Sequence, residues 1–382
     1  MQDYISKALL QIKKLGNHRI ARRKKQKCDS IIQKINSDSS IVDNRLKSIP
    51  QNVSSILFLD TLDCFGDALF INSIIHQLNL THPEIDITVA TSHKLNAIYA
   101  TSICKIIDLS AQLPPADIII DLCYSDNALI DFRLDKLKSS TSFIITCSKL
   151  VSAAKIYSAY FDFSKTNHFG ERTQQITSVI QKLCTHKIQP TQKNIAINAT
   201  EPDNVLPPYI PHIKATKDSH NYIYINTEGR TKDRNISPDQ LSYLAEYLSQ
   251  HYPNLHAVVY SNNQESIEII KNSSNLSLAH TQNFLDACIL VENSLLTITP
   301  DTSIVHVSSA YNIPVIALYC GNDLEYFREY STSQIWAPLS KQHILLKPPV
   351  YWVKQVPIKR IKPAKITEAV DILLTQLISN PH

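Results

Sequence analysis

The amino-acid sequence predicts an α/β protein of two Rossmann-like domains, each built around a parallel sheet. Two blocks of alternating apolar runs and helical patterns support this prediction, and a Pro-rich polar stretch at about 187–219 separates them. Apolar or β-branched runs of four to six residues without strict alternation are typical of parallel strands buried on both faces. The length of 382 residues also exceeds what one hydrophobic core usually holds.

The first block begins with a buried strand at Ile56–Leu59, a short loop and a helix over about Asp67–Leu80. Helices between successive strands indicate βαβ units. The further strands of this block are expected at Ile85–Ala90, Ile106–Leu109, Ile118–Leu122 and Phe143–Cys147.

The second block opens with the strand Tyr222–Asn226 and a helix that ends near His251. Ser237 followed by Pro238 predicts the start of that helix, because Ser is a good N-cap and Pro suits the first helical position. Two more helices are expected, over about Thr302–Tyr311 and Ile366–Ile378. Further strands are expected at Ala257–Tyr260, Leu295–Thr299 and Val315–Tyr319.

The net charge of +4 is unevenly distributed along the chain. The first 36 residues carry +8 and the rest carries −4, which argues against a nucleic-acid enzyme with a basic cleft. In this segment Ile5, Leu9, Ile12 and Leu15 recur at helical spacing among lysines and arginines. The pattern fits a helix lying on an anionic inner-membrane surface, and it fits equally a helix packed on the protein body.

The expected domain organisation follows from these patterns. No run approaches the eighteen or more apolar residues of a membrane span, and the N-terminus has no signal-peptide pattern. The eight cysteines include no CxxC pair, which indicates reduced thiols and no zinc site. We therefore expect a cytoplasmic protein, peripheral on the inner membrane if its first 36 residues bind lipid. Its segments are a basic helical arm (1–45), an N-terminal domain (46–200), a C-terminal domain (215–365) and a final helix (366–382).

Glycine is rare in this chain, with five residues where an average protein of this length would have roughly five times as many. Three of them, Gly66, Gly229 and Gly321, each follow a predicted strand. In open α/β sheets ligands bind at the carboxyl ends of the strands. The chain has no GxGxxG and no GxxxxGK[ST], so a standard dinucleotide fold or P-loop is unsupported.

Asp67 is the first candidate for a chemical role. It follows Gly66 at the predicted start of a helix, where a carboxylate also serves simply as a helix cap. Asp63 lies four residues earlier in the same loop and is a rival for any catalytic role.

Two clusters of polar residues follow strands of the second block. In the cluster from Thr299 to His306, Asp301 or Thr302 can cap a helix whose free N–H groups can bind an anion. His306 falls one turn later on the face of Thr302. The loop from Asn226 to Arg234 mixes hydroxyls with cations suited to phosphate, although a solvated charged loop would look the same.

These residues resemble glycosyltransferase family 9, the bacterial lipopolysaccharide heptosyltransferases. The resemblance covers about residues 50–340 in separated patches, and the C-terminal patch is the most specific. The patches are Phe65-Gly66-Asp67-Ala68-Leu69, the strand Ile118–Leu122 ending in Asp-Leu, Asp301-Thr302-Ser303-Ile304-Val305-His306, and Pro314–Gly321.

The resemblance implies the GT-B fold, in which two Rossmann-like domains face each other across a central cleft. It implies an inverting, metal-independent transfer of heptose from ADP-heptose to the inner core of lipopolysaccharide. The partners would be this nucleotide sugar and a lipid-linked glycan acceptor, with no cofactor and no nucleic acid. Asp67 would be the general base that takes the proton of the acceptor hydroxyl.

The remaining site residues are expected to bind the nucleotide sugar. By resemblance, Thr227 lies near the diphosphate, and Asp301, Thr302 and His306 hold the phosphates and the sugar. Glu265 matches an acidic position that contacts the nucleoside. The full expected set of substrate-binding residues is Gly66, Thr227, Arg230, Lys232, Arg234, Glu265, Asp301, Thr302, Ser303, His306 and Gly321.

Two positions depart from the family pattern. Its signature glycine is Ser303 here, and its diphosphate-binding lysine is Asn235, so that Arg234 or Lys232 would have to supply the charge. The departures leave alternatives open. These are a transferase for another donor, or for a protein or capsule-glycan acceptor, a catalytically silent sugar-nucleotide-binding protein, and an epimerase of the same two-domain fold.

Overall fold

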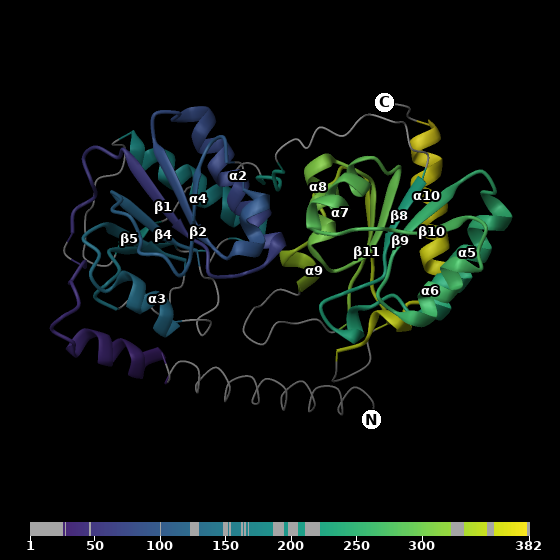
Figure 1. Ribbon diagram of the computed structural model, residues 1–382, viewed down its shortest axis with the longest axis horizontal. Coiled ribbons are helices and arrows are strands. Elements are labelled where there is room, and N and C mark those ends of the chain that lie inside the picture. The colour runs from purple at the N-terminus through teal and green to yellow at the C-terminus, as the bar shows by residue number, and fades with distance from the viewer. Residues whose placement is uncertain are drawn as a thin grey trace, which may run out of the picture. The chain divides into compact units, whose positions relative to one another are not determined.

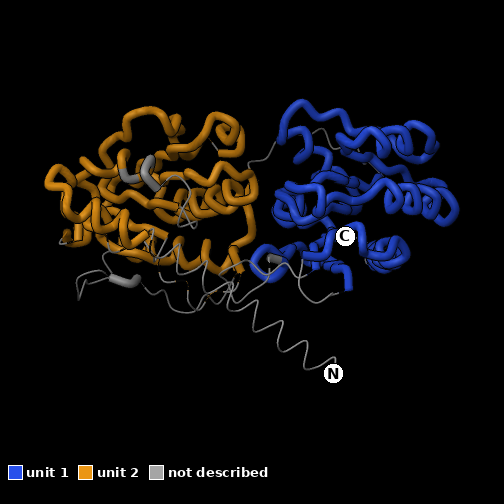
Figure 2. The backbone as a smooth tube through the Cα atoms, turned by 90° about the horizontal axis from the view of Figure 1, so that it is seen from below, with its two compact units in different colours: residues 1–14, 212–382 blue, residues 15–211 orange. Residues whose placement is uncertain are grey.

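The computed structural model describes most of the chain in two compact units, residues 15–211 and residues 1–14 with 212–382, which are coloured separately in Figure 2. The residues described are 26, 28–45, 47–99, 101–122, 130–147, 152, 154–161, 163, 166, 168–185, 195–197, 205–210, 222–321, 332–349 and 355–379. The expected amphipathic helix over Ile5–Leu15 and most of the expected connection at 187–219 lie outside them.

The N-terminal unit contains a seven-stranded parallel sheet in the order β3-β2-β1-β4-β5-β6-β7. The chain winds outward from β1 to β3, then returns to β4 beside β1 and continues the other way, so the order reverses between β1 and β4. The strands are β1 (Ser55–Leu59), β2 (Asp86–Thr91), β3 (Lys105–Asp108), β4 (Ile118–Asp121), β5 (Phe143–Thr146), β6 (Ala159–Phe161) and β7 (Ile195–Ile197).

Helices complete this unit. Besides a helix at residues 28–37, they include α2 (Phe65–Thr81), the 3₁₀ helix η1 (His93–Ile98), α3 (Ile130–Leu137) and α4 (Phe169–Cys184). Figure 1 shows α2 beside α4, and the rings of Phe70 and Phe169 meet between them at a centroid distance of 5.0 Å. Because α2 begins at Phe65 rather than at the expected Asp67, Asp67 lies inside its first turn.

The unit begins earlier in the chain than the expected boundary at residue 46. Residues 28–37 form a helix, and Ile35 is buried in a core cluster with Leu57 and Leu59 of β1. The Asn44 side chain donates hydrogen bonds to the carbonyls of Ser140 (3.2 Å) and Ile156 (3.1 Å). The last part of the expected basic arm is therefore built into the N-terminal unit.

The C-terminal unit repeats the same plan with a six-stranded parallel sheet in the order β10-β9-β8-β11-β12-β13. Here the order reverses between β8 and β11. Its strands are β8 (Tyr222–Asn226), β9 (His256–Tyr260), β10 (Leu276–Leu278), β11 (Leu296–Pro300), β12 (Val315–Leu318) and β13 (His343–Leu346).

The helices of the C-terminal unit cover both faces of its sheet (Figure 1). The main core lies between the sheet and the pair α5 and α10, and a smaller cluster packs Val305 of α8 against β12. Ser237 caps α5 as expected, in a reciprocal capping box with Gln240. The helices are η2 (Lys232–Arg234), α5 (Pro238–His251), α6 (Gln264–Lys271), α7 (Phe284–Glu292), α8 (Ser303–Tyr311), α9 (Thr332–Ile335), η3 (Ile358–Arg360) and α10 (Pro363–Ser379).

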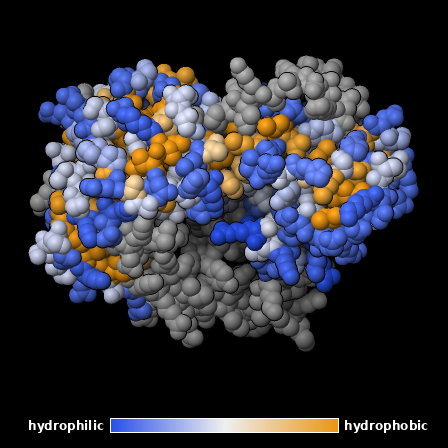
Figure 3. Space-filling model, in the orientation of Figure 1, coloured by the Kyte–Doolittle hydropathy of each residue, from blue (hydrophilic) through white to orange (hydrophobic). Residues whose placement is uncertain are grey.

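The surface of the described part is mainly polar. Figure 3 shows hydrophilic residues over most of the coloured face, with hydrophobic residues in smaller groups between them. Among the described helices, none combines the length and the hydropathy needed to cross a membrane. The seven described cysteines are free thiols, and burial raises the pKa of Cys288 to about 12.

Candidate functional site

The candidate donor site lies at the carboxyl ends of β8 and β11, where the strand order of the second sheet reverses. In open α/β sheets a ligand-binding crevice forms at this point, because the loops that follow the two strands diverge to opposite faces. The β8 side supplies Asn226 and Thr227, and the β11 side supplies Thr299 and Thr302. The structure thus brings together two clusters that are more than 70 residues apart in the sequence.

Asn226 joins the two sides of this crevice. Its buried side-chain nitrogen donates to Thr299 Oγ1 (3.1 Å), to Thr302 Oγ1 (3.3 Å) and to the carbonyl of Glu228 (3.1 Å). Asn226 was expected only as the first residue of the polar loop, although a polar side chain at the end of an apolar strand is a usable signal. Asn226 therefore fixes the loop after β8 against the start of α8.

Thr302 is the N-cap of α8, as one of the two expected alternatives, and its Oγ1 accepts from the backbone nitrogen of Ile304 (3.3 Å). Ser303, where the family has glycine, is the first residue of α8 and is half-buried. The positive end of this nine-residue helix faces the crevice, which favours an anion there. His306 is buried one turn later, with its ring 5.5 Å from that of Trp336.

Asp301 and Arg234 form an ion pair across the crevice. The distance from Arg234 Nη1 to Asp301 Oδ2 is 3.0 Å, and both side chains are largely shielded from solvent. Arg230 and Lys232 lie beside them on the loop after β8, and both are exposed. Within the part of the chain that the structure describes, neither of these two cations makes a salt bridge, so both can meet an anionic ligand.

Asn235 occupies the position where the family has its lysine, and its side chain is used to fix the loop. Its Oδ1 accepts from the backbone nitrogen of Gly229 (2.8 Å), and its Nδ2 donates to Glu228 Oε2 (2.9 Å). The sequence predicts that Arg234 or Lys232 supplies the missing charge, and both are placed on the same short turn, η2.

Two expected residues lie further along the same edge of the sheet. Glu265 is exposed in the first turn of α6, after β9. Gly321 follows β12 and pairs with Val356 through two backbone hydrogen bonds of 2.9 and 2.8 Å. The contact of each of these residues with a ligand stays a prediction.

Gly229 carries a prediction of its own, because its backbone passes very close to Arg234. A Cβ atom at Gly229 would lie 2.5 Å from Arg234 Cβ and 2.7 Å from the Arg234 carbonyl oxygen. Gly229→Ala should therefore displace the turn, destabilise the protein by about 1–3 kcal/mol and weaken nucleotide binding. Denaturant unfolding and calorimetry with ADP would measure both effects. The exposed Thr231→Ala is the control, and ADP affinity unchanged in Gly229→Ala would contradict the prediction.

In the N-terminal unit, a buried carboxylate follows β1 at the corresponding edge of the sheet. Asp60 accepts hydrogen bonds at Oδ2 from Thr91 (3.0 Å) and Tyr99 (2.8 Å), and at Oδ1 from the Leu62 nitrogen (3.1 Å). Burial raises the pKa of the Asp60 carboxyl above its ordinary value, although these hydrogen bonds act in the opposite direction. Sequence reasoning missed Asp60, which ties the loop after β1 to the end of β2.

Asp63 and Asp67, the two candidate bases, have different surroundings. Asp63 has a positive φ of 54° and is half-exposed, with Oδ2 2.6 Å from Lys94 Nζ and Oδ1 2.5 Å from Ser92 Oγ. Burial tends to raise the pKa of Asp63, but Lys94 and Ser92 outweigh it and hold the pKa below its ordinary value. Asp67 is half-buried in the first turn of α2. The pKa of Tyr99 is raised by burial and by Asp60, and the charge of Asp67 adds a smaller effect in the same direction.

A second buried carboxylate, Asp121, ends β4 on the other side of the reversal in the first sheet. Arg133 Nη1 lies 3.2 Å from both of its oxygens, and the Tyr157 hydroxyl donates to Oδ2 at 2.6 Å. Asp121 and Arg133 are both fully buried. The Asp of the Asp-Leu pair that resembles family 9 is thus, in this chain, one partner of a buried ion pair.

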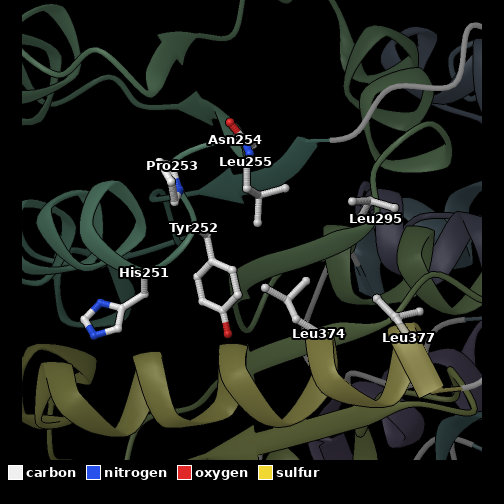
Figure 4. A pocket seen from close by; sticks show the side chains of 8 residues that line it. All are labelled: His251, Tyr252, Pro253, Asn254, Leu255, Leu295, Leu374 and Leu377. Carbon is white, nitrogen blue, oxygen red and sulfur yellow. The ribbon is translucent and has the colours of Figure 1, made fainter.

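A cavity of about 510 Å³ lies elsewhere in the C-terminal unit. Leu255 and Leu295 line it just before β9 and β11, and Figure 4 shows Leu374 and Leu377 on α10 opposite the loop that carries Tyr252. Leu255 and Leu295 therefore mark the amino ends of these two strands. The cavity is therefore at the opposite edge of the sheet from the polar crevice and does not belong to the candidate site.

Comparison with known proteins agrees with this geometry. Residues 214–345 match the model of glycosyltransferase family 9 (heptosyltransferase). A curated relative, "Putative lipopolysaccharide heptosyltransferase 4" of Escherichia coli (strain K12), is 24% identical over 136 residues, which are 35% of this chain and 36% of the relative. The aligned part of the chain thus spans about a third of the relative's length.

Solved structures resemble a larger part of the chain. A glycosyltransferase family 9 protein from Veillonella parvula has a TM-score of 0.64 at 14% identity, covering 86% of this chain and 100% of its own. The E. coli ADP-heptose lps heptosyltransferase II has a TM-score of 0.61 at 15% identity, covering 84% and 99%. E. coli heptosyltransferase WaaC with ADP has a TM-score of 0.59 at 11% identity, covering 84% and 98%.

Two doubly wound α/β units with these structural relatives define a protein of the GT-B fold, as the sequence predicts. The resemblance to glycosyltransferase family 9 is also confirmed, and the match to the family model falls on the unit that carries the polar crevice. The expected cleft between the two sheets stays a prediction.

Proposed function

We propose that this chain is an inverting, metal-independent glycosyltransferase that moves heptose from ADP-heptose to the inner core of lipopolysaccharide. The observation that carries the proposal is the crevice at the strand reversal of the second sheet, where Asn226 contacts Thr302 and Arg234 pairs with Asp301. The family match lies within this unit, and three of the named relatives carry heptosyltransferase in their names, one of them solved with ADP.

The proposed reaction is a single displacement. Asp67 takes the proton of the acceptor hydroxyl while the acceptor oxygen attacks the anomeric carbon of the donor. The bond between that carbon and the diphosphate oxygen breaks, and its electron pair stays on the diphosphate. Attack from the face opposite the leaving group inverts the anomeric configuration.

The developing negative charge needs partners fixed in place before the reaction. The start of α8, the Arg234 guanidinium and the exposed cations Arg230 and Lys232 can supply them without a metal ion. We assign Asp67 as the base because it follows Gly66 as in the family pattern, and because Lys94 and Ser92 lower the pKa of Asp63 and so make it a weaker base than an ordinary carboxylate.

A donor panel tests the proposal. The full-length protein is incubated with ADP-heptose, ADP-glucose or a UDP-sugar, together with truncated lipopolysaccharide cores, and nucleotide release is followed. ADP-heptose should give the fastest release that depends on the acceptor. A faster rate with a UDP-sugar would contradict the proposed donor but keep the transferase. A transferase with a different donor is the second candidate function. One observation favours it: Asn235, at the position of the family's diphosphate-binding lysine, holds the loop instead.

A further inference from the structure

Glu228 is a carboxylate inside the candidate donor site that the proposed function does not use. Its Oε1 accepts from the Asn262 nitrogen (2.9 Å) and the Ser261 hydroxyl (3.1 Å), and its Oε2 accepts from Asn235 Nδ2 (2.9 Å). The Thr227 hydroxyl donates to the Tyr260 carbonyl (3.0 Å) and has Glu228 Oε1 as a second acceptor at 3.3 Å. The half-buried carboxylate therefore joins the loop after β8 to the loop after β9.

The partners of the Glu228 carboxylate lie on the loops after β8 and β9, at the ligand-binding edge of the sheet. Thr227 and Asn235 flank the same turn as Arg230, Lys232 and Arg234. The main-chain carbonyl of Glu228 accepts a hydrogen bond from the Asn226 side chain, which also donates to Thr302 at the start of α8. The Glu228 carboxylate thus lies one hydrogen bond from Asn235, the residue after Arg234, and on the loop that also carries Arg230 and Lys232.

The negative charge of Glu228 repels a nucleotide sugar and the nucleoside diphosphate released from it to different extents. When the sugar departs, the electron pair of the broken bond stays on the terminal phosphate, so the free diphosphate carries one more negative charge than the donor. A neighbouring carboxylate repels the more charged species more strongly, and in a half-buried site solvent screens this only partly.

We propose that Glu228 is a specificity-determining residue that weakens binding of the nucleoside diphosphate product relative to less charged nucleotides, and so promotes product release. The inference rests on the proposed function. Oε1 already has three hydrogen-bond donors around it, so its contribution to a ligand is through charge rather than through a new hydrogen bond.

Calorimetry at low salt tests this with ADP and AMP as probes on the full chain. Glu228→Gln removes the charge and should bind ADP about tenfold more tightly than the wild type, which is about 1.4 kcal/mol, with AMP changed much less. Glu268→Gln is the matched control, because Glu268 is an exposed carboxylate of the same unit, on α6, paired with Lys271. It should leave both affinities unchanged.

A second pair of variants separates charge from loop order. Asn235→Ala releases Oε2 but keeps the carboxylate, so it should not tighten ADP binding. Glu228→Ala provides a second charge-free protein if Gln disturbs the fold, which thermal unfolding would show. An unchanged ratio of ADP to AMP affinity in folded Glu228→Gln or Glu228→Ala would overturn the inference, as would tighter ADP binding by Asn235→Ala. If the wild type and the variants all fail to bind ADP, the proposed function falls and the inference with it.

Discussion

Asp67→Asn should lower kcat by about 10²–10⁴-fold while leaving ADP affinity nearly unchanged. The amide keeps the size and the polarity of the side chain but cannot take the proton of the acceptor hydroxyl. Asp67 lies in the first turn of α2, in the N-terminal unit, whereas the residues expected to bind nucleotide lie in the C-terminal unit. Loss of turnover with nucleotide binding retained is therefore the pattern that separates a base from a binding residue.

Asp63→Asn is the matched control for this experiment, because it makes the same change four residues earlier, in the loop before α2. The variant removes the ion pair between Asp63 and Lys94. Because this pair is exposed, kcat should fall by roughly tenfold or less. Initial rates at saturating donor, together with ADP calorimetry, measure both variants. A large loss of kcat in Asp63→Asn with Asp67→Asn nearly unaffected would assign the base to Asp63.

The largest effect on stability is expected at the buried pair of Asp121 and Arg133. Asp121→Asn removes the negative charge of Asp121 from beside the buried Arg133 guanidinium, and breaking such a pair by removing one partner costs about 3–5 kcal/mol. The Tyr157 hydroxyl also loses its carboxylate acceptor. Equilibrium unfolding in urea should show this as a lower midpoint for the N-terminal unit.

Asp86→Asn provides the comparison, since it removes a carboxylate from the same sheet. Asp86 pairs with Lys105, and both side chains are more than two-thirds exposed, so the variant should unfold like the wild type. Equal midpoints for Asp121→Asn and Asp86→Asn would show that the buried pair does not stabilise the unit.

Most of the fold could be predicted from sequence because its central strands are continuous apolar runs. β1, β4, β8 and β12 were expected within a residue or two of their observed bounds, and each lies inside its sheet with a neighbour on both sides. The strands that were missed are β6, β7, β10 and β13. Three of these four are edge strands, and three have only three residues, too few to show a pattern.

The candidate site could be predicted only in outline. A polar residue or a glycine after a buried strand marks the ligand-binding edge, and this indicated Gly229, Asp301 and Thr302. The bonds that shape the site join distant residues. Glu228 and Asn262, for example, are 34 positions apart in the sequence, and no local sequence pattern reveals such a pair. The role of Asn235 depends on the same three-dimensional contacts.

The most direct test of the central claim, that this chain transfers heptose, is mass spectrometry of the acceptor. Truncated lipopolysaccharide core is incubated with ADP-heptose and either the wild type or Asp67→Asn. The account predicts that the acceptor gains the mass of one heptose with the wild type and none with Asp67→Asn over the same time. An acceptor left unmodified by the wild type with every nucleotide sugar tested, or modified equally by both proteins, would contradict it.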